Sequence, residues 1–302
     1  MPKTMTWFGN RLYISTHDAR GFWCSMVLSP KSDERSIDFQ TEALACLSPT
    51  GRLLISRDRD QIVRVRKVDG RAWKAGDVLF SCQKLSSVPI VGYAWSYDDR
   101  LAAVQLRDGS VHCYQVQSGR RNNRGQERAV YRLDAALTEW HAMQFSPDGK
   151  RIAVTTASGV TIYDALKSGE GREVGQGQVT SIAWSFDGRY LALGRHDSTI
   201  AVHLVRSGRM LREWTGHTSA VSALCWSPGD DFLVSGDKHG NVLLWDTTGD
   251  PGNWSLISSI EDESAEALSA IEVIAWSPDG QRCALLDAHD RWDTFAILSW
   301  RR

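Results

Sequence analysis

Histidines, cysteines and paired carboxylates are the side chains of this chain that could bind a metal ion or transfer protons. The 302 residues include eight histidines and six cysteines. No histidine pair forms a His-Glu-x-x-His motif, and no two cysteines are spaced as Cys-x-x-Cys, the patterns typical of zinc sites. We therefore predict no metal centre and no bound cofactor.

Other patterns that resemble catalytic or phosphate-binding motifs lack the neighbouring residues or elements that such motifs need. A glycine-rich run at 169–177 is followed by no Lys-Ser/Thr and opens no helix, so we expect a flexible loop between two strands. Asp58 and Asp60, like Asp98 and Asp99, fall in tight turns, where Asp is favoured because its carboxylate binds nearby backbone. No Gly-x-Ser-x-Gly motif is present. These patterns predict a protein that is not an enzyme.

Composition and charge describe an ordinary globular chain. Hydrophobic residues make up 42% and charged residues 24%, while 35 basic against 36 acidic residues leave a net charge of −1. This balance argues against nucleic acid or an acidic membrane as the partner. Without a signal-peptide pattern or an apolar run of membrane-spanning length, we expect a cytoplasmic protein, although a nuclear location is equally compatible. The scattered cysteines lie in apolar stretches, which predicts buried, reduced thiols.

A short pattern recurs along the whole chain. An apolar run usually ending in Trp or Phe is followed by Ser, a turn rich in Pro, Asp and Gly, and a second apolar run. Pro and Asp-Gly are the residues that such a turn requires, so each copy predicts a β-hairpin. The anchoring serines are Ser48, Ser96, Ser146, Ser185, Ser227 and Ser277, with successive spacings of 48, 50, 39, 42 and 50 residues.

This period in an all-β pattern is typical of propeller blades. We predict one all-β domain over residues 1–302, a seven-bladed β-propeller of four-stranded antiparallel blades. The apolar first strands should pack between blades and bury Trp95, Trp184, Trp226 and Trp276. The predicted blades are approximately 1–41, 42–86, 87–138, 139–177, 178–217, 218–268 and 269–302.

The sixth copy resembles the WD-repeat family, with Gly216-His217 before the first strand and Trp245-Asp246 ending the third. His217 is placed to bind Ser235, and Ser235 to bind the Trp245 indole, which predicts a buried polar relay. In the family, an Asp in the turn between the second and third strands completes this relay. The aligned residue here is His239, so we expect the relay to be incomplete.

The last copy leaves three interpretations of its outer edge. Strands are predicted near 271–276, 283–286 and 294–300, with no fourth strand after them. The blade is either three-stranded, completed by a strand from a partner, or part of a chain longer than this one.

The family resemblance also implies a binding face. In WD-repeat propellers, the turns between second and third strands share one face with the loops that precede the first strands. That face should bind an acidic or phosphorylated segment of a partner protein, or else be a solvated charged surface. Its predicted residues are Arg57, Arg59, Arg107, Trp140, His141, Arg195, His196, Lys238, His239 and Arg291.

Two loop insertions are further candidates for partner contact. Residues 250–254 with the acidic run 261–266, and residues 120–128, are locally charged and poor in apolar residues. This predicts mobile loops that either order on a partner or are tolerated without a function. Together these features predict a non-catalytic adaptor. The alternatives are a targeting or sensor module of a larger protein and, less favoured, an enzyme with its site in the central channel.

Overall fold

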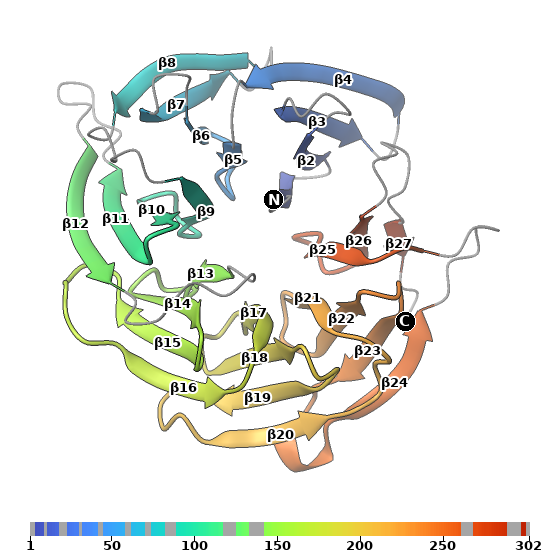
Figure 1. Ribbon diagram of the computed structural model, residues 1–302. Coiled ribbons are helices and arrows are strands. Elements are labelled where there is room, and N and C mark those ends of the chain that lie inside the picture. The colour runs from blue at the N-terminus through green and yellow to red at the C-terminus, as the bar shows by residue number, and fades with distance from the viewer. Residues whose placement is uncertain are drawn as a thin grey trace. The chain divides into compact units, whose positions relative to one another are not determined.

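The computed structural model describes residues 4–8, 11–17, 23–29, 32–41, 45–57, 62–69, 74–81, 89–116, 125–132, 142–260, 268–288 and 297–299. Its regular elements are 27 β-strands and one short 3₁₀ helix, η1 (Pro251–Asn253). The strands form seven sheets, numbered here in chain order, and within each sheet strands consecutive in sequence are neighbours (Figure 1). The sheet count agrees with the predicted fold class.

The first three sheets have four strands each. Sheet 1 contains β1 (Thr4–Phe8), β2 (Arg11–His17), β3 (Trp23–Ser29) and β4 (Ser32–Thr41). Sheet 2 contains β5 (Ala45–Leu47), β6 (Leu53–Arg57), β7 (Val63–Asp69) and β8 (Lys74–Ser81). Sheet 3 contains β9 (Ile90–Trp95), β10 (Leu101–Leu106), β11 (Ser110–Val116) and β12 (Gly125–Arg132).

Three of the remaining four sheets are also four-stranded. Sheet 4 contains β13 (Met143–Phe145), β14 (Arg151–Thr156), β15 (Gly159–Asp164) and β16 (Arg172–Gln176). Sheet 5 contains β17 (Val179–Trp184), β18 (Tyr190–Arg195), β19 (Ile200–Leu204) and β20 (Met210–Trp214). Sheet 6 contains β21 (Val221–Trp226), β22 (Phe232–Asp237), β23 (Val242–Asp246) and β24 (Ser255–Ile260). Sheet 7 has three strands among the described residues: β25 (Ile271–Trp276), β26 (Arg282–Asp287) and β27 (Ile297–Ser299).

Contacts divide the chain into two compact units. The first comprises residues 1–136, 148–152 and 164–170, and the second comprises residues 137–147, 153–163 and 171–302. The second unit contains sheets 5 to 7 complete, and its first strands follow one another, with β17 against β21 and β21 against β25.

The recurring turn is closed by its own side chains, as sheet 5 illustrates. Ser185 Oγ donates to Asp187 Oδ1 at 2.7 Å and accepts from the Tyr190 N–H at 2.9 Å. Gly188 has φ of 69°, a conformation that costs glycine nothing. The Ser-x-Asp-Gly pattern therefore repeats because each residue has a separate task in the turn between first and second strands.

The tryptophans of the first strands are buried, as predicted, and each also ties its sheet to the preceding one. The four indole N–H groups donate at 3.1–3.3 Å to backbone carbonyls of the previous sheet's first strand: Trp95 to Cys46, Trp184 to Gln144, Trp226 to Ala183 and Trp276 to Cys225. The hydrogen bonds satisfy indoles that burial would otherwise leave unpaired.

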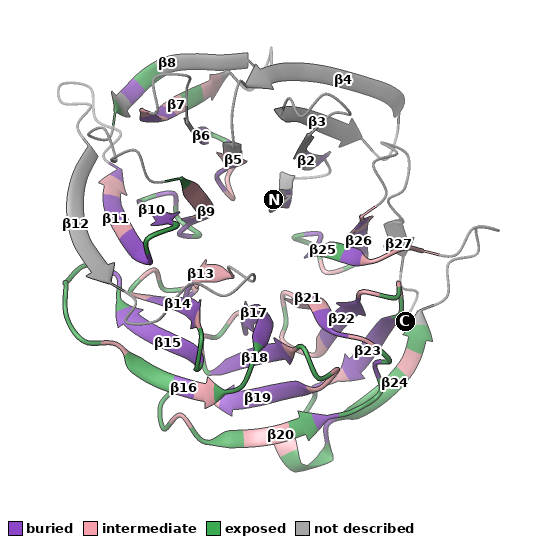
Figure 2. Ribbon diagram, viewed as in Figure 1, coloured by how far each residue is buried: buried purple, intermediate pink, exposed green. Residues whose placement is uncertain are grey.

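Burial follows strand order in sheets 4 to 6 (Figure 2). The second and third strands of sheets 5 and 6 are almost continuously buried, whereas the outer strands β16 and β24 are mostly exposed and β20 is only partly buried. The apolar core thus lies between neighbouring sheets rather than at their outer edges.

Two segments differ from the sequence expectation. The glycine-rich run contains strand β16 rather than only a flexible loop. At the start of the 250–266 insertion, Trp254 is 3% exposed and packs edge-on against Tyr190, and Arg212 Nη2 donates to the Trp254 carbonyl at 3.0 Å. The apolar surface that Trp254 buries stabilises this part of the insertion, although the neighbouring residues in the sequence are polar.

Candidate functional site

A buried polar relay occupies one end of sheet 6. His217, in the loop before β21, lies with its Nε2 2.6 Å from Ser235 Oγ on β22. Trp245 on β23 donates its indole N–H to the same Ser235 oxygen at 2.8 Å. The three predicted relay residues are therefore in contact, and each is at least 90% buried.

The relay also has its carboxylate, so the expectation of an incomplete relay was wrong. Asp237, the last residue of β22, lies with Oδ2 3.2 Å from His217 Nδ1 and is fully buried. It stands two residues before His239, the position that aligns with the family's Asp. The sequence places this Asp directly after Ser235-Gly236, but the spacing does not show that its side chain turns inward.

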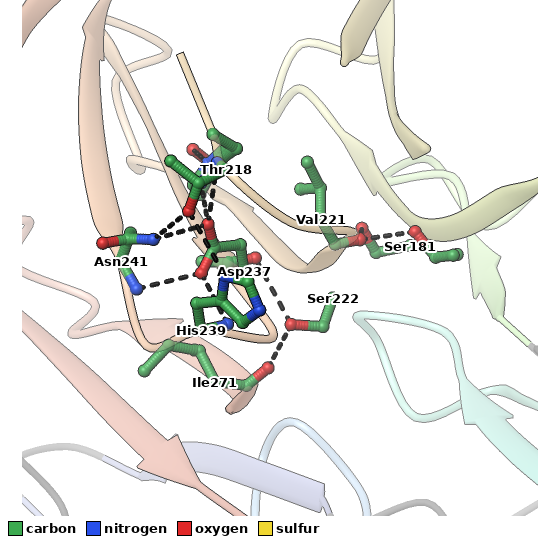
Figure 3. A network of polar contacts seen from close by, with 12 residues as sticks. Ser181, Thr218, Val221, Ser222, Asp237, His239, Asn241 and Ile271 are labelled. Carbon is green, nitrogen blue, oxygen red and sulfur yellow. Dashed lines mark hydrogen bonds and ion pairs between the residues drawn. The ribbon is translucent and has the colours of Figure 1, made fainter. Parts of the chain in front are cut away.

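Asp237 organises the exposed turn as well as the buried relay (Figure 3). Its Oδ1 accepts from the backbone N–H groups of His239 and Asn241 at 2.9 and 3.0 Å, and its Oδ2 accepts from Asn241 Nδ2 at 2.8 Å. Asn241 Nδ2 also donates to Thr218 Oγ1 at 2.8 Å. One buried carboxylate thus fixes the side chains that this turn presents to solvent.

The same contacts set the protonation states of the relay. Burial lowers the pKa of His217, although the neighbouring Asp237 charge acts in the opposite direction. Burial opposes ionisation of Asp237, but hydrogen bonds from Asn241 and His239 outweigh it and lower the pKa of that carboxyl. The relay is therefore a neutral imidazole beside a carboxylate at neutral pH.

One hydrogen bond recurs at the turns between second and third strands. The first residue after the second strand donates its backbone N–H to the residue before the first strand. The pairs are Arg107 to Pro89, His196 to Gln178, Lys238 to Ala220 and Ala288 to Ala270, at 2.8–3.1 Å. In sheets 3, 5, 6 and 7, this bond holds both kinds of loop at one edge of the sheet, here called the second-turn edge. Arg107, His196 and Lys238 are thereby equivalent residues.

The predicted binding residues differ in what they offer at this edge. Arg107, His196 and His239 are exposed and Lys238 is half-buried. Arg195 already has a partner within its own sheet: its side chain is 13% exposed, and Nη1 pairs with Glu213 Oε1 at 2.5 Å. The pairing spans β18 and the non-adjacent strand β20, which the sequence does not indicate.

The side chains of the other predicted binding residues lie outside the part of the chain that the structure describes. Arg57 is the last residue of β6, and its side chain lies outside the described residues. Arg59, Trp140, His141 and Arg291 also lie outside them.

Within the described part of the chain, no cluster of three or more His, Cys, Asp or Glu side chains is arranged to hold a metal ion. The cysteines described there are free thiols; Cys113 and Cys283 are buried, Cys46 and Cys225 half-buried. Burial raises the pKa of the Cys46 thiol to about 12 and that of Cys225 to about 11, so both are unreactive at neutral pH. Among the described residues, no helix has the length and hydropathy to cross a membrane.

Comparison with known proteins adds the family. Residues 208–246 match the family described as "WD domain, G-beta repeat", and residues 161–222 match "Anaphase-promoting complex subunit 4 WD40 domain". The human "Echinoderm microtubule-associated protein-like 4" is 32% identical over 133 residues, covering 40% of this chain and 13% of that protein. The mouse "Telomerase Cajal body protein 1" is 24% identical over 234 residues, covering 69% of this chain and 43% of that protein. The chain spans less than half the length of these relatives.

A solved structure resembles the whole chain. A chain in the "Crystal Structure of Mitotic Checkpoint Complex" superposes with a TM-score of 0.76 at 17% identity, covering 100% of this chain and 90% of that one. This likeness confirms the predicted fold class, a β-propeller. The WD-repeat match at residues 208–246, with the His217–Ser235–Trp245 relay inside it, supports the resemblance to the WD-repeat family.

Proposed function

We propose that the second-turn edge binds an acidic or phosphorylated segment of a partner protein. WD-repeat propellers are in general scaffolds for protein interaction, and this proposal adds the surface and the chemistry of the segment. The observation that carries it is the equivalence, inside the second unit, of His196 and Lys238, each placed at the start of its turn by the same backbone hydrogen bond. Basic side-chain types at equivalent positions, here His196 and Lys238, favour an anionic ligand.

The turn of sheet 6 offers the best-ordered part of this surface. Thr218, His239 and Asn241 are exposed and are linked to one another or to Asp237. Side chains already held in place lose less conformational entropy when a ligand binds. This pre-organisation supports a specific contact rather than a diffuse charged surface.

The experiment is fluorescence anisotropy with a labelled synthetic peptide that carries glutamates and one phosphothreonine. We expect the double variant His196→Glu/Lys238→Glu to bind this peptide at least about tenfold more weakly than the unchanged chain. The matched control is Lys150→Glu/Arg189→Glu, two exposed cations at the opposite strand ends, which should bind as the unchanged chain does. Equal affinities of the two double variants would remove the second-turn edge from the proposal.

A second proposal concerns sheet 7, because its three described strands make it one strand shorter than the other sheets. A partner strand pairing with β27 would complete it by β-augmentation. Amide hydrogen exchange of residues 297–299 tests this: the purified complex should exchange more slowly there than the isolated chain. Unchanged exchange in the complex would exclude strand addition at β27.

The adaptor role and the location in the cell are also part of this proposal. A non-catalytic adaptor in the cytoplasm is the function we favour over a targeting or sensor module of a larger protein. The relative named "Telomerase Cajal body protein 1" carries a nuclear body in its name. Fluorescence microscopy of the tagged full-length protein distinguishes the cytoplasm from the nucleus.

A further inference from the structure

A cleft of about 460 Å³ lies between sheets 2 and 3, inside the first unit. It opens at the first-turn edge, which we define by the turns at 48–52 and 96–100 and which lies at the opposite strand ends from the second-turn edge. Apolar side chains in its lining are Leu53, Val68 and Val116. Cationic side chains in its lining are Arg52, Lys67 and Arg100, all of them exposed.

Hydrogen bonds join the two walls of the cleft. Asp99 reaches from the turn of sheet 3 to that of sheet 2, where its Oδ2 accepts from Ser48 Oγ at 2.9 Å and also from the Thr50 hydroxyl. The backbone carbonyls of Arg52 and Arg100 accept from the N–H groups of Val68 and Val116 at 2.8 and 2.7 Å. Both arginines therefore extend from a fixed backbone, and the cleft exists before any ligand arrives.

The charges of the cleft are unbalanced because of one turn residue. In the turns of sheets 3 and 5, an Asp two residues earlier pairs with the arginine, as in Arg100–Asp98 at 3.5 Å and Arg189–Asp187 at 3.9 Å. The turn of sheet 2 has Thr50 at that position, so Arg52 lacks this partner. Asp99, which lines the cleft, already accepts from Ser48 and Thr50. No described carboxylate forms an ion pair with Arg52 or Lys67.

We propose that this cleft is a second docking site, which takes an acidic segment of a partner protein bearing an aliphatic residue next to a carboxylate. The aliphatic side chain packs on Leu53 and Val116, and the carboxylate lies between Arg52 and Lys67. The apolar lining is what favours a peptide over a nucleic acid, whose backbone would leave it uncovered. The proposal goes beyond the function proposed above, since it concerns another edge and other residues.

The probe is a phage-displayed random peptide library selected on the full chain. We expect selected sequences that combine Asp or Glu with a neighbouring Leu, Ile or Val. In fluorescence anisotropy, such a peptide should bind Arg52→Glu/Lys67→Glu at least about tenfold more weakly, and its affinity should fall as salt rises from about 0.05 M to about 0.5 M. Arg189→Glu, at the equivalent turn position of sheet 5, is the matched control and should bind normally.

Circular dichroism establishes that the variants fold, and Arg52→Gln/Lys67→Gln replaces the charge-reversed pair if that pair does not. Selected peptides without acidic residues, or full affinity in Arg52→Gln/Lys67→Gln, would overturn the proposal. So would a labelled DNA duplex that binds the chain and is lost in that variant, because the cleft would then serve another class of ligand. His196→Glu/Lys238→Glu should keep full affinity for the selected peptide, which separates this test from that of the second-turn edge.

Discussion

At the scale of single residues, the buried carboxylate of Asp237 has the largest structural task. It accepts hydrogen bonds from Thr218, His239 and Asn241 and lies against His217. Asp237→Ala leaves these donors buried or strained without an acceptor, so we expect the free energy of unfolding to fall by about 2–4 kcal/mol. Urea denaturation measures it.

His239→Ala is the control for this prediction. His239 is exposed, and its ring makes only a long contact of 3.4 Å with Thr218 Oγ1. We expect it to cost less than about 0.5 kcal/mol, as is usual for surface positions. If His239→Ala lowered the free energy of unfolding more than Asp237→Ala, the relay would depend on residue 239 rather than on the carboxylate of Asp237.

The protonation of His217 makes stability depend on pH. Burial lowers its pKa in the folded state, so the unfolded chain takes up a proton first as pH falls. Its contribution to the free energy of unfolding is complete above about pH 6.5, the ordinary imidazole pKa, and is lost as pH falls below that value. We expect the unchanged chain to lose more stability than His217→Gln between pH 7.5 and 5. His203, whose pKa burial also lowers, adds the same trend to both proteins. Parallel urea curves across this range would contradict the assignment.

The relay shows where sequence reasoning ends at this scale. His217, Ser235 and Trp245 were predicted because their residue types and spacing match one repeat. Asp237 was missed because the carboxylate enters from a neighbouring position, and only coordinates reveal which of two nearby side chains turns inward. The Arg195–Glu213 ion pair was not predictable for a related reason, since Glu213 lies on a strand that does not pair with β18.

At the scale of elements, the glycines of the turns differ in how closely other atoms surround them. Gly240, between β22 and β23, has φ of 86°, and a Cβ added there would lie 2.0 Å from the Leu268 carbonyl oxygen. Gly249 has φ of 71° but nothing within 4 Å of such a Cβ. We expect Gly240→Ala to lower the free energy of unfolding by about 2–4 kcal/mol and Gly249→Ala by only about 1 kcal/mol. Thermal and urea unfolding of the pair would contradict this if both variants lost the same amount.

The recurring turn pattern in the sequence predicted part of the strand arrangement. The turn pattern located the first and second strands of sheets 2 to 7, because the same residues close each turn. The contacts between turns were not predictable. Asp230 has a left-handed φ of 60° and accepts from the backbone N–H groups of Phe186 and Asp187 in the neighbouring sheet, as Asp99 does towards Thr50. In both turns a carboxylate stands where other copies have glycine, and its use depends on a partner about 40–50 residues away.

At the scale of the whole molecule, stability should follow strand order rather than position in the chain. In sheets 5 and 6, the second and third strands are buried between neighbouring sheets, whereas β24 is mostly exposed, β20 is only partly buried, and both lie at sheet edges. Local opening costs little where few apolar contacts are broken, so outer strands should open without the rest. We expect amide hydrogen exchange to be fastest in β16, β20 and β24 and slowest in β18, β19, β22 and β23. The aromatic contact of Trp254 with Tyr190 should slow exchange in the segment just before β24, at residues 252–254. Uniform exchange across a sheet would mean that each sheet opens as one unit, and protection would then report contacts between sheets rather than the depth of each strand.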